Sequence, residues 1–303
     1  MTSRHTPILL TLAAALLWGS SFTVVKVGLR YLDPYSFVLL RFLVATGLLV
    51  AVVLARGQWH LFAGYLRDRY VIFLGLTIAA SYGFQFVGQV RTTASNAVII
   101  INSSAVLVPP LSYLLLKEAI GPRQLLSLAM GVIGVYLIAR GTGGASAGTG
   151  QLAGDLLVAG SALAYGFYVV LTRMAVTRRT LSEIPLMAGV FAWSLPVFAV
   201  MSVPTLSRGV EVTKEAWAAI AYLAVFCSIL PFTIWTAAMK RIGAVTSAIV
   251  LLAELIFGVV IARIVLSETP SPATLVGCCV IAAAILVVGL KGEADPADGR
   301  AGQ

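Results

Sequence analysis

The stretch that decides the fold runs from Gly243 to Glu268 and reads GAVTSAIVLLAELIFGVVIARIVLSE. It is a long apolar run with one carboxylate, Glu254, in its middle. A helix rises about 1.5 Å per residue, which puts Glu254 about 16 Å from Gly243 and about 21 Å from Glu268, near the midplane of a bilayer. A charge at that depth is costly and usually faces a polar cavity. We therefore expect a membrane span whose single acid faces a cavity.

The pattern of this stretch occurs twice in the chain. Residues Thr93 to Glu118, TASNAVIIINSSAVLVPPLSYLLLKE, form a similar apolar run that also ends in glutamate, and Glu118 and Glu268 are 150 residues apart. The prolines that follow, Pro122 and Pro272, are separated by the same offset. This repetition indicates a duplicated chain, in which Glu254 is the feature that differs between the two copies.

The composition indicates an integral membrane protein. The 303 residues are 59% hydrophobic and only 11% charged, and the mean hydropathy is +0.97, which leaves too few charges for a soluble surface. Apolar segments of about 20 residues separated by short loops are typical of helices rather than a β-barrel. The net charge of +9 is interpreted as basic residues in cytoplasmic loops, and nucleic acid is not an expected partner.

The sequence predicts an all-α membrane protein with ten transmembrane helices. The predicted spans are Ile8–Leu29, Tyr35–Ala55, Tyr70–Val90, Thr93–Leu116, Arg123–Ala139, Gly154–Met174, Glu183–Val203, Glu215–Met239, Ala244–Leu266 and Ser271–Leu290. Ten spans put both termini on one side of the membrane. With the termini in the cytoplasm, cytoplasmic segments hold twelve Lys and Arg residues and outer loops hold five, which favours this orientation. We expect a multi-pass protein of the cell inner membrane.

The predicted domains follow the duplication. Residues 1–140 form the first five-helix repeat, 141–152 a Gly-rich linker, 153–290 the second five-helix repeat, and 291–303 a cytoplasmic tail. Because five is an odd number, the second repeat enters the membrane with the opposite orientation. Such inverted repeats are common in secondary transporters, whose binding site lies where the two halves meet.

No metal site or cofactor is predicted. Cys227, Cys278 and Cys279 lie in apolar runs, and their number and placement indicate neither a disulfide framework nor a metal cluster. His5 and His60 lie in the N-terminal segment and in a loop, so neither contributes to a proton relay across the membrane.

Several motifs together resemble the EamA family of the drug/metabolite transporter superfamily. They are LLWGSSF at residues 16–22, the run Arg41-Phe42-Leu43-Val44-Ala45, and spans that end in Lys117-Glu118 and Ser267-Glu268. The resemblance implies two five-helix EamA-like repeats around a central cavity, cytoplasmic termini and the movement of small organic metabolites, similar to bacterial aromatic amino acid exporters. The chain departs from the family where Leu255 follows Glu254 and where Ala105 stands, since family members often carry proline at these two places.

The candidate substrate-binding residues are polar or aromatic side chains within the spans. Glu254 is a candidate site for a substrate amine or a proton, and the alternative is a protonated acid bonded to a neighbouring helix. Tyr82, Gln85 and Gln89 form one polar stripe on a helix face. The alternative is that these side chains only form hydrogen bonds between neighbouring helices. The remaining candidates are Asn102, Trp18, Tyr165, Tyr168 and Trp235, with core packing as the alternative for the aromatic residues. Arg41, six residues into its span, is interpreted as a paired cation without a catalytic role.

A secondary transporter that exports neutral or aromatic amino acids or related compounds by alternating access is the predicted function. Uptake or exchange of another metabolite or of a cationic drug stays open as an alternative. A channel or an intramembrane enzyme is disfavoured, because the chain lacks an HExxH motif and a second intramembrane carboxylate. The expected partners are a small-molecule substrate and the lipid bilayer. Coupling to protons, and a monomer or a homodimer, stay open.

Overall fold

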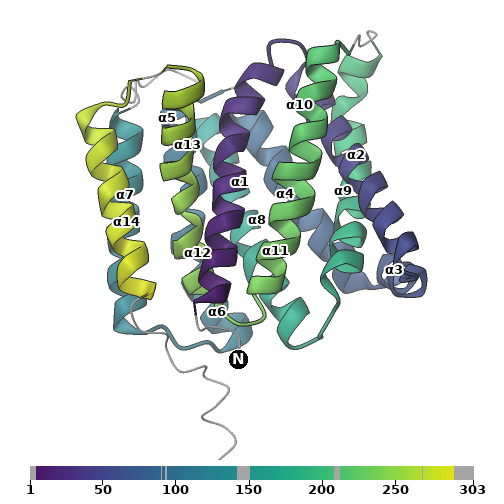
Figure 1. Ribbon diagram of the computed structural model, residues 1–303, viewed down its shortest axis with the longest axis horizontal. Coiled ribbons are helices and arrows are strands. Elements are labelled where there is room, and N and C mark those ends of the chain that lie inside the picture. Colours follow the sequence, from purple (N-terminus) through teal and green to yellow (C-terminus); the bar gives the residue numbers. More distant parts are fainter. Residues whose placement is uncertain are drawn as a thin grey trace, which may run out of the picture.

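The protein is a bundle of helices that run roughly parallel to one another (Figure 1). The structure, a computed structural model, describes residues 5–89, 91–92, 94–141, 151–207, 212–267 and 269–289. These residues form helices α1 (Thr6–Gly28), α2 (Pro34–Ala55), α3 (Trp59–Arg67), α4 (Arg69–Gln89), α5 (Ala94–Asn102), α6 (Ser104–Leu116), α7 (Pro122–Gly141), α8 (Gln151–Thr177), α9 (Glu183–Leu206), α10 (Lys214–Ala224), η1 (Val225–Ile229), α11 (Leu230–Ala238), α12 (Ala244–Leu251), α13 (Ala253–Val265) and α14 (Pro272–Gly289).

The prediction of ten membrane spans is confirmed. Ten helical segments are long and apolar enough to cross a bilayer, and each overlaps one of the ten predicted ranges. Most of the predicted linker, at 142–150, and the tail from residue 290 onward lie outside the described residues. The sequence did not predict α3, a short helix between the second and third spans that lies at the lower right of Figure 1.

Two of the spans consist of two helices with a single residue between them. The fourth span is interrupted at Ser103, and the ninth at Leu252. At both places the backbone changes to a tighter turn: the Val106 amide donates to the Ser103 carbonyl at 2.9 Å, and the Leu255 amide donates to the Leu252 carbonyl at 3.1 Å. The interruptions therefore occur without a proline at Ala105 or Leu255, and the second one lies directly before Glu254.

The eighth span contains a wider turn. Between α10 and α11 the backbone forms one π-helical segment, Val225–Ile229, and Pro231 follows it. A π-bulge of this kind is rare and is often found at functional sites. Proline has no N–H, so Pro231 cannot donate to the carbonyl four residues earlier, that of Cys227. That carbonyl is consequently available to side chains from other helices.

Small residues let the last helices of the two halves pack closely. α7 and α14, which lie side by side at the left of Figure 1, meet at Gly134 and Gly277. A β-carbon built on Gly134 would lie 2.5 Å from Ile281 Cγ1 and 2.9 Å from the Gly277 carbonyl oxygen. Membrane helices use small residues in this way, because van der Waals contact replaces the hydrophobic effect in lipid.

We predict that Gly134→Leu lowers the melting temperature of the purified protein, because the added side chain overlaps atoms of α14 and such overpacking costs about 1–3 kcal/mol. Gly47→Ala in α2 is the matched control, because a β-carbon there meets nothing within 4 Å. The control should be neutral or slightly stabilising, since alanine is the better helix former. Equal melting temperatures for Gly134→Leu and the wild-type protein would contradict the close packing of α7 on α14.

Candidate functional site

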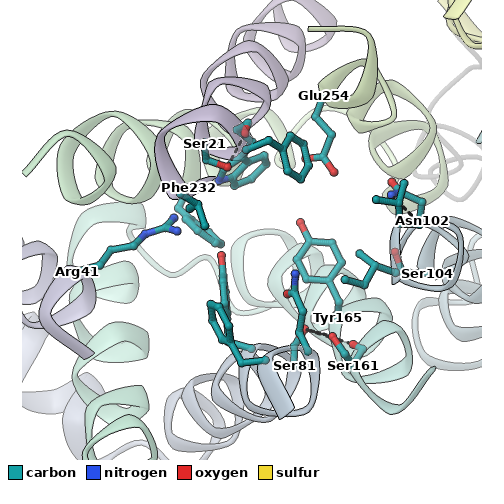
Figure 2. Close-up of a pocket in the computed structure, with 17 residues that line it drawn as sticks. Ser21, Arg41, Ser81, Asn102, Ser104, Ser161, Tyr165, Phe232 and Glu254 are labelled. Atoms are coloured by element: carbon teal, nitrogen blue, oxygen red, sulfur yellow. Dashed lines mark hydrogen bonds between the residues drawn. The ribbon is translucent and has the colours of Figure 1, made fainter. Parts of the chain in front are cut away.

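A cavity of about 230 Å³ lies between the two halves of the chain. Figure 2 shows its wall, which combines aromatic rings with hydroxyl, amide and charged groups. The lining residues are Trp18, Ser21, Phe22, Val25, Arg41, Ser81, Tyr82, Gln85, Phe86, Val98, Ile101, Asn102, Ser104, Ser161, Tyr165, Phe232 and Glu254. A concave site with mostly apolar walls and a few convergent polar groups is typical of small-molecule binding, and this cavity is smaller than the usual range of roughly 300–1,000 Å³.

Glu254 reaches the cavity because the ninth span is interrupted just before it. It lies in the first turn of α13, which begins at Ala253. Gly19 of α1 packs against this turn, and a β-carbon on Gly19 would lie only 2.7 Å from the Glu254 carbonyl oxygen. Among the described residues no hydrogen bond or ion pair holds the Glu254 carboxylate, which lies beside the open space of Figure 2. The predicted intramembrane acid therefore faces a cavity.

Arg41, which the sequence analysis did not include among the candidate site residues, lines the same cavity. Its Nε donates to Ser228 Oγ at 2.8 Å, and its Nη2 donates to the Cys227 carbonyl at 2.8 Å. The guanidinium carbon lies 5.9 Å from the centre of the Tyr82 ring. No carboxylate pairs with it among the described residues.

The turn around Cys227 explains how the guanidinium and an indole converge. The Cys227 carbonyl, which Pro231 leaves without its usual donor, accepts from Arg41 and also from Trp18 Nε1 at 3.1 Å. Ser228 Oγ accepts from Arg41 and donates to the Leu223 carbonyl at 3.0 Å. The π-helical segment thus fixes α1 and α2 to the eighth span at the cavity wall.

Six of the nine predicted site residues line this cavity. They are Trp18, Tyr82, Gln85, Asn102, Tyr165 and Glu254. The side chain of Gln89 lies outside the described part of the chain. The lining residues that sequence analysis did not single out include Arg41, Ser81, Ser161 and Phe232. Arg41 could have been found from the sequence, because the chain offers no second intramembrane acid with which it could pair.

Tyr168 and Trp235, the other two predicted residues, lie behind the wall. Both side chains are fully buried, and their rings stack with centroids 6.1 Å apart. Trp235 Nε1 donates to Ser247 Oγ at 2.8 Å, and the Trp235 ring meets Trp18 edge-on. They form a second aromatic layer in this conformation, so their contact with a ligand stays a prediction.

The cavity lies away from the face of the bundle at which the N-terminus is found, which we call the N-terminal face (the bottom of Figure 1). α1 and α4 both begin at this face, and their lining residues belong to the second half of each helix. Below the aromatic layer, a polar layer joins the two halves: Arg173 Nε donates to Glu118 Oε1 at 3.1 Å, and the Ala244 amide donates to Glu118 Oε2 at 3.2 Å. These contacts join spans of both halves on the side of the cavity that faces the N-terminal face.

A second ion pair lies at the N-terminal face itself. Arg179 Nη2 and Asp68 Oδ2 are 2.8 Å apart, and both side chains are partly exposed. Burial acts to raise the pKa of the Asp68 carboxyl, but the hydrogen bonds from Arg179 and from the Tyr70 amide outweigh it and hold the pKa below its usual range. Asp68 is therefore ionised, and its ion pair with Arg179 connects the residue before α4 to the segment after α8.

We predict that Trp235→Phe lowers the melting temperature, because it removes the hydrogen bond to Ser247 in a fully buried layer, a loss of about 1 kcal/mol. Tyr165→Phe is the matched control, because the Tyr165 hydroxyl points into the cavity of Figure 2 and makes no hydrogen bond to the described residues. Its melting temperature should equal that of the wild-type protein. A lower melting temperature for Tyr165→Phe than for Trp235→Phe would contradict this assignment of Trp235 to the core and Tyr165 to the cavity wall.

Comparison with known proteins places the chain in a family. The model of the EamA-like transporter family matches residues 5–140 and 152–290. A solved crystal structure of a protein 21% identical to this chain superposes with a TM-score of 0.79 and covers 95% of this chain and 98% of its own, which shows a shared fold.

Similar proteins of known sequence carry transporter names. An "Uncharacterized transporter" of Archaeoglobus fulgidus is 29% identical over 95% of this chain and 99% of its own length. A "Probable terminal-alkyne amino-acid exporter" of Streptantibioticus cattleyicolor is 27% identical over 89% of both chains, and a "Probable amino-acid metabolite efflux pump" of Salmonella typhimurium is 25% identical over 92% of this chain and 93% of its own. The family match over almost the whole chain and the ten spans around a polar cavity lead to one conclusion: this multi-pass membrane protein belongs to the EamA-like transporter family.

Proposed function

We propose that this transporter exports neutral or aromatic amino acids, or closely related compounds, by alternating access of the central cavity. The observation that carries the proposal is Glu254, an acid without a protein partner in the described structure, at mid-span in a cavity walled by aromatic rings. An acid in this position can attract an ammonium group or carry a proton. The rings of Trp18, Phe22 and Phe232 supply apolar and cation-attracting surface for the rest of the molecule.

Helix packing supports an inverted repeat, with residues 1–140 and 153–290 as its two halves. If the spans are numbered one to ten, the third packs on the sixth and the first on the eighth; the first packs on the ninth and the fourth on the sixth. An inverted repeat makes each span of the first half equivalent to the span numbered five higher in the second half. Under this equivalence the 3–6 contact corresponds to the 1–8 contact, and the 1–9 contact corresponds to the 4–6 contact. The contacts of the second span with the seventh, and of the fifth with the tenth, map onto themselves. This is the pattern of a two-fold axis between the halves.

The contacts on the side of the N-terminal face support alternating access. Glu118 at the end of the fourth span contacts Arg173 in the sixth and Ala244 at the start of the ninth, so one carboxylate joins three spans on this side. Lys240 and Glu183 form a further pair close to the same face. Transport requires these contacts to separate while the opposite end of the cavity closes, which is a rocking of the two halves around a fixed site.

The names of two relatives support the amino-acid class. They are called a terminal-alkyne amino-acid exporter and an amino-acid metabolite efflux pump, and each aligns with most of this chain at 25–27% identity. The charge of the loops supports an inner-membrane protein with both termini in the cytoplasm, because Lys and Arg are concentrated on that side.

We predict that Glu254→Gln lowers transport of L-phenylalanine in proteoliposome counterflow at least tenfold, because the variant loses the only acid among the residues that line the cavity. Glu215→Gln is the matched control: Glu215 is an exposed acid in the first turn of α10. Its transport should equal that of the wild-type protein. Equal rates for the two variants would remove Glu254 from the mechanism.

The orientation gives a labelling prediction. Cysteine at Arg30, an exposed residue after α1, should react with a membrane-impermeant maleimide in intact cells. Cysteine at Arg56, an exposed residue after α2 at the other face, should react only after the cells are permeabilised. The wild-type protein supplies the background, because its three cysteines lie within helices of the bundle. Labelling of Arg56→Cys in intact cells would reverse the orientation.

A further inference from the structure

The cavity contains two opposite charges that the protein keeps apart. Arg41 and Glu254 both line it, and Figure 2 shows them on opposite sides of the open space. No ion pair joins the two side chains, although each is the only charged residue of its sign among the residues that line the cavity. A buried cation without a counter-ion is costly, and it usually marks a place where a ligand supplies the missing charge.

The partners of Arg41 orient the guanidinium but do not neutralise it. They are Ser228 Oγ and the Cys227 carbonyl, and both are neutral. A guanidinium carries five N–H donors, so these two acceptors leave donors free. The side chain is 6% exposed, and the phenyl ring of Phe42, 5.7 Å from the guanidinium carbon, limits its movement. The protein therefore holds a rigid, incompletely used donor group at the cavity wall.

We propose that Arg41 binds the carboxylate of a zwitterionic substrate, with the substrate ammonium directed toward Glu254. This inference rests on the proposed function and names a binding group for it. A guanidinium fork matches a carboxylate in shape and charge. The two charged groups also select against ions that carry only one charge. Glu254 repels a simple anion, and Arg41 repels a simple cation. A molecule that carries both a carboxylate and an ammonium is attracted by both side chains.

The aromatic wall defines the rest of the ligand. Trp18, Phe22, Phe86 and Phe232 line the cavity, and Tyr165 presents its hydroxyl between the two charged sides. The apolar side chain of a zwitterionic amino acid can pack on these rings while its two charged groups face Arg41 and Glu254. The recognised class is thus a zwitterionic amino acid with an uncharged, apolar side chain.

The test compares two ligands that share one ring: L-phenylalanine, a zwitterion, and phenethylamine, which has the ammonium but no carboxylate. Dissociation constants are measured by titration calorimetry on purified full-length protein at pH 7. For the wild-type protein we expect L-phenylalanine to bind at least tenfold more tightly, since a hydrogen-bonded charged group contributes that much or more. Arg41→Gln should abolish this difference by weakening L-phenylalanine binding alone. Arg41→Lys should keep part of it, and Arg56→Gln, an exposed cation, should keep all of it.

Two results would overturn the inference. One is a wild-type protein that binds phenethylamine as tightly as L-phenylalanine, and the other is an Arg41→Gln variant that binds both ligands more weakly by the same factor, as a purely structural residue would. In both cases amino-acid binding, and with it the proposed function, would stand. Binding of neither ligand by the wild-type protein would instead contradict the proposed substrate class. If Arg41→Gln does not fold, the wild-type comparison and Arg41→Lys decide the question.

Discussion

The structure depends on one constraint: an acid and a guanidinium at the depth of a bilayer core must not face lipid. Glu254 and Arg41 satisfy it by facing one cavity between the two halves of the chain. The backbone adapts in order to place them. The ninth span is interrupted at Leu252, one helical residue before Glu254, and the eighth span widens into a π-helical turn whose Cys227 carbonyl holds Arg41. Irregular backbone at membrane depth is tolerated where it lies against protein or a cavity, as it does here.

The same turn joins the aromatic wall to the charged site. Pro231 removes the usual donor to the Cys227 carbonyl, and this carbonyl then accepts from both Trp18 and Arg41. Trp18 in turn contacts Phe232 and Trp235 edge-on, so a shift of this carbonyl would also shift rings in both aromatic layers. A rigid first layer around the charges, supported by a buried second layer, is what precise binding requires.

The sequence was sufficient for the fold and for six of the seventeen residues that line the cavity. Length and apolarity alone predict ten spans, and the isolated acid in the ninth span predicts the cavity. Helix rotation is harder to predict, because these spans are apolar on nearly all faces and carry almost no amphipathic signal. For that reason Trp18 and Trp235 were indistinguishable in the sequence, although one lines the cavity and the other lies behind it. Helix α3 was missed because it is too short for a span. Arg41 was left out of the site because a cation inside a span was expected to be paired with another residue.

The most direct test of the central claim, that this cavity is the substrate site, is an experimental structure of the protein at saturating L-phenylalanine. The account predicts one ligand in the cavity, with its carboxylate within hydrogen-bond distance of the Arg41 guanidinium and its ring against Trp18 and Phe232. Ligand bound elsewhere on the protein, with the cavity unchanged and Arg41 still bonded only to Ser228 and Cys227, would contradict it.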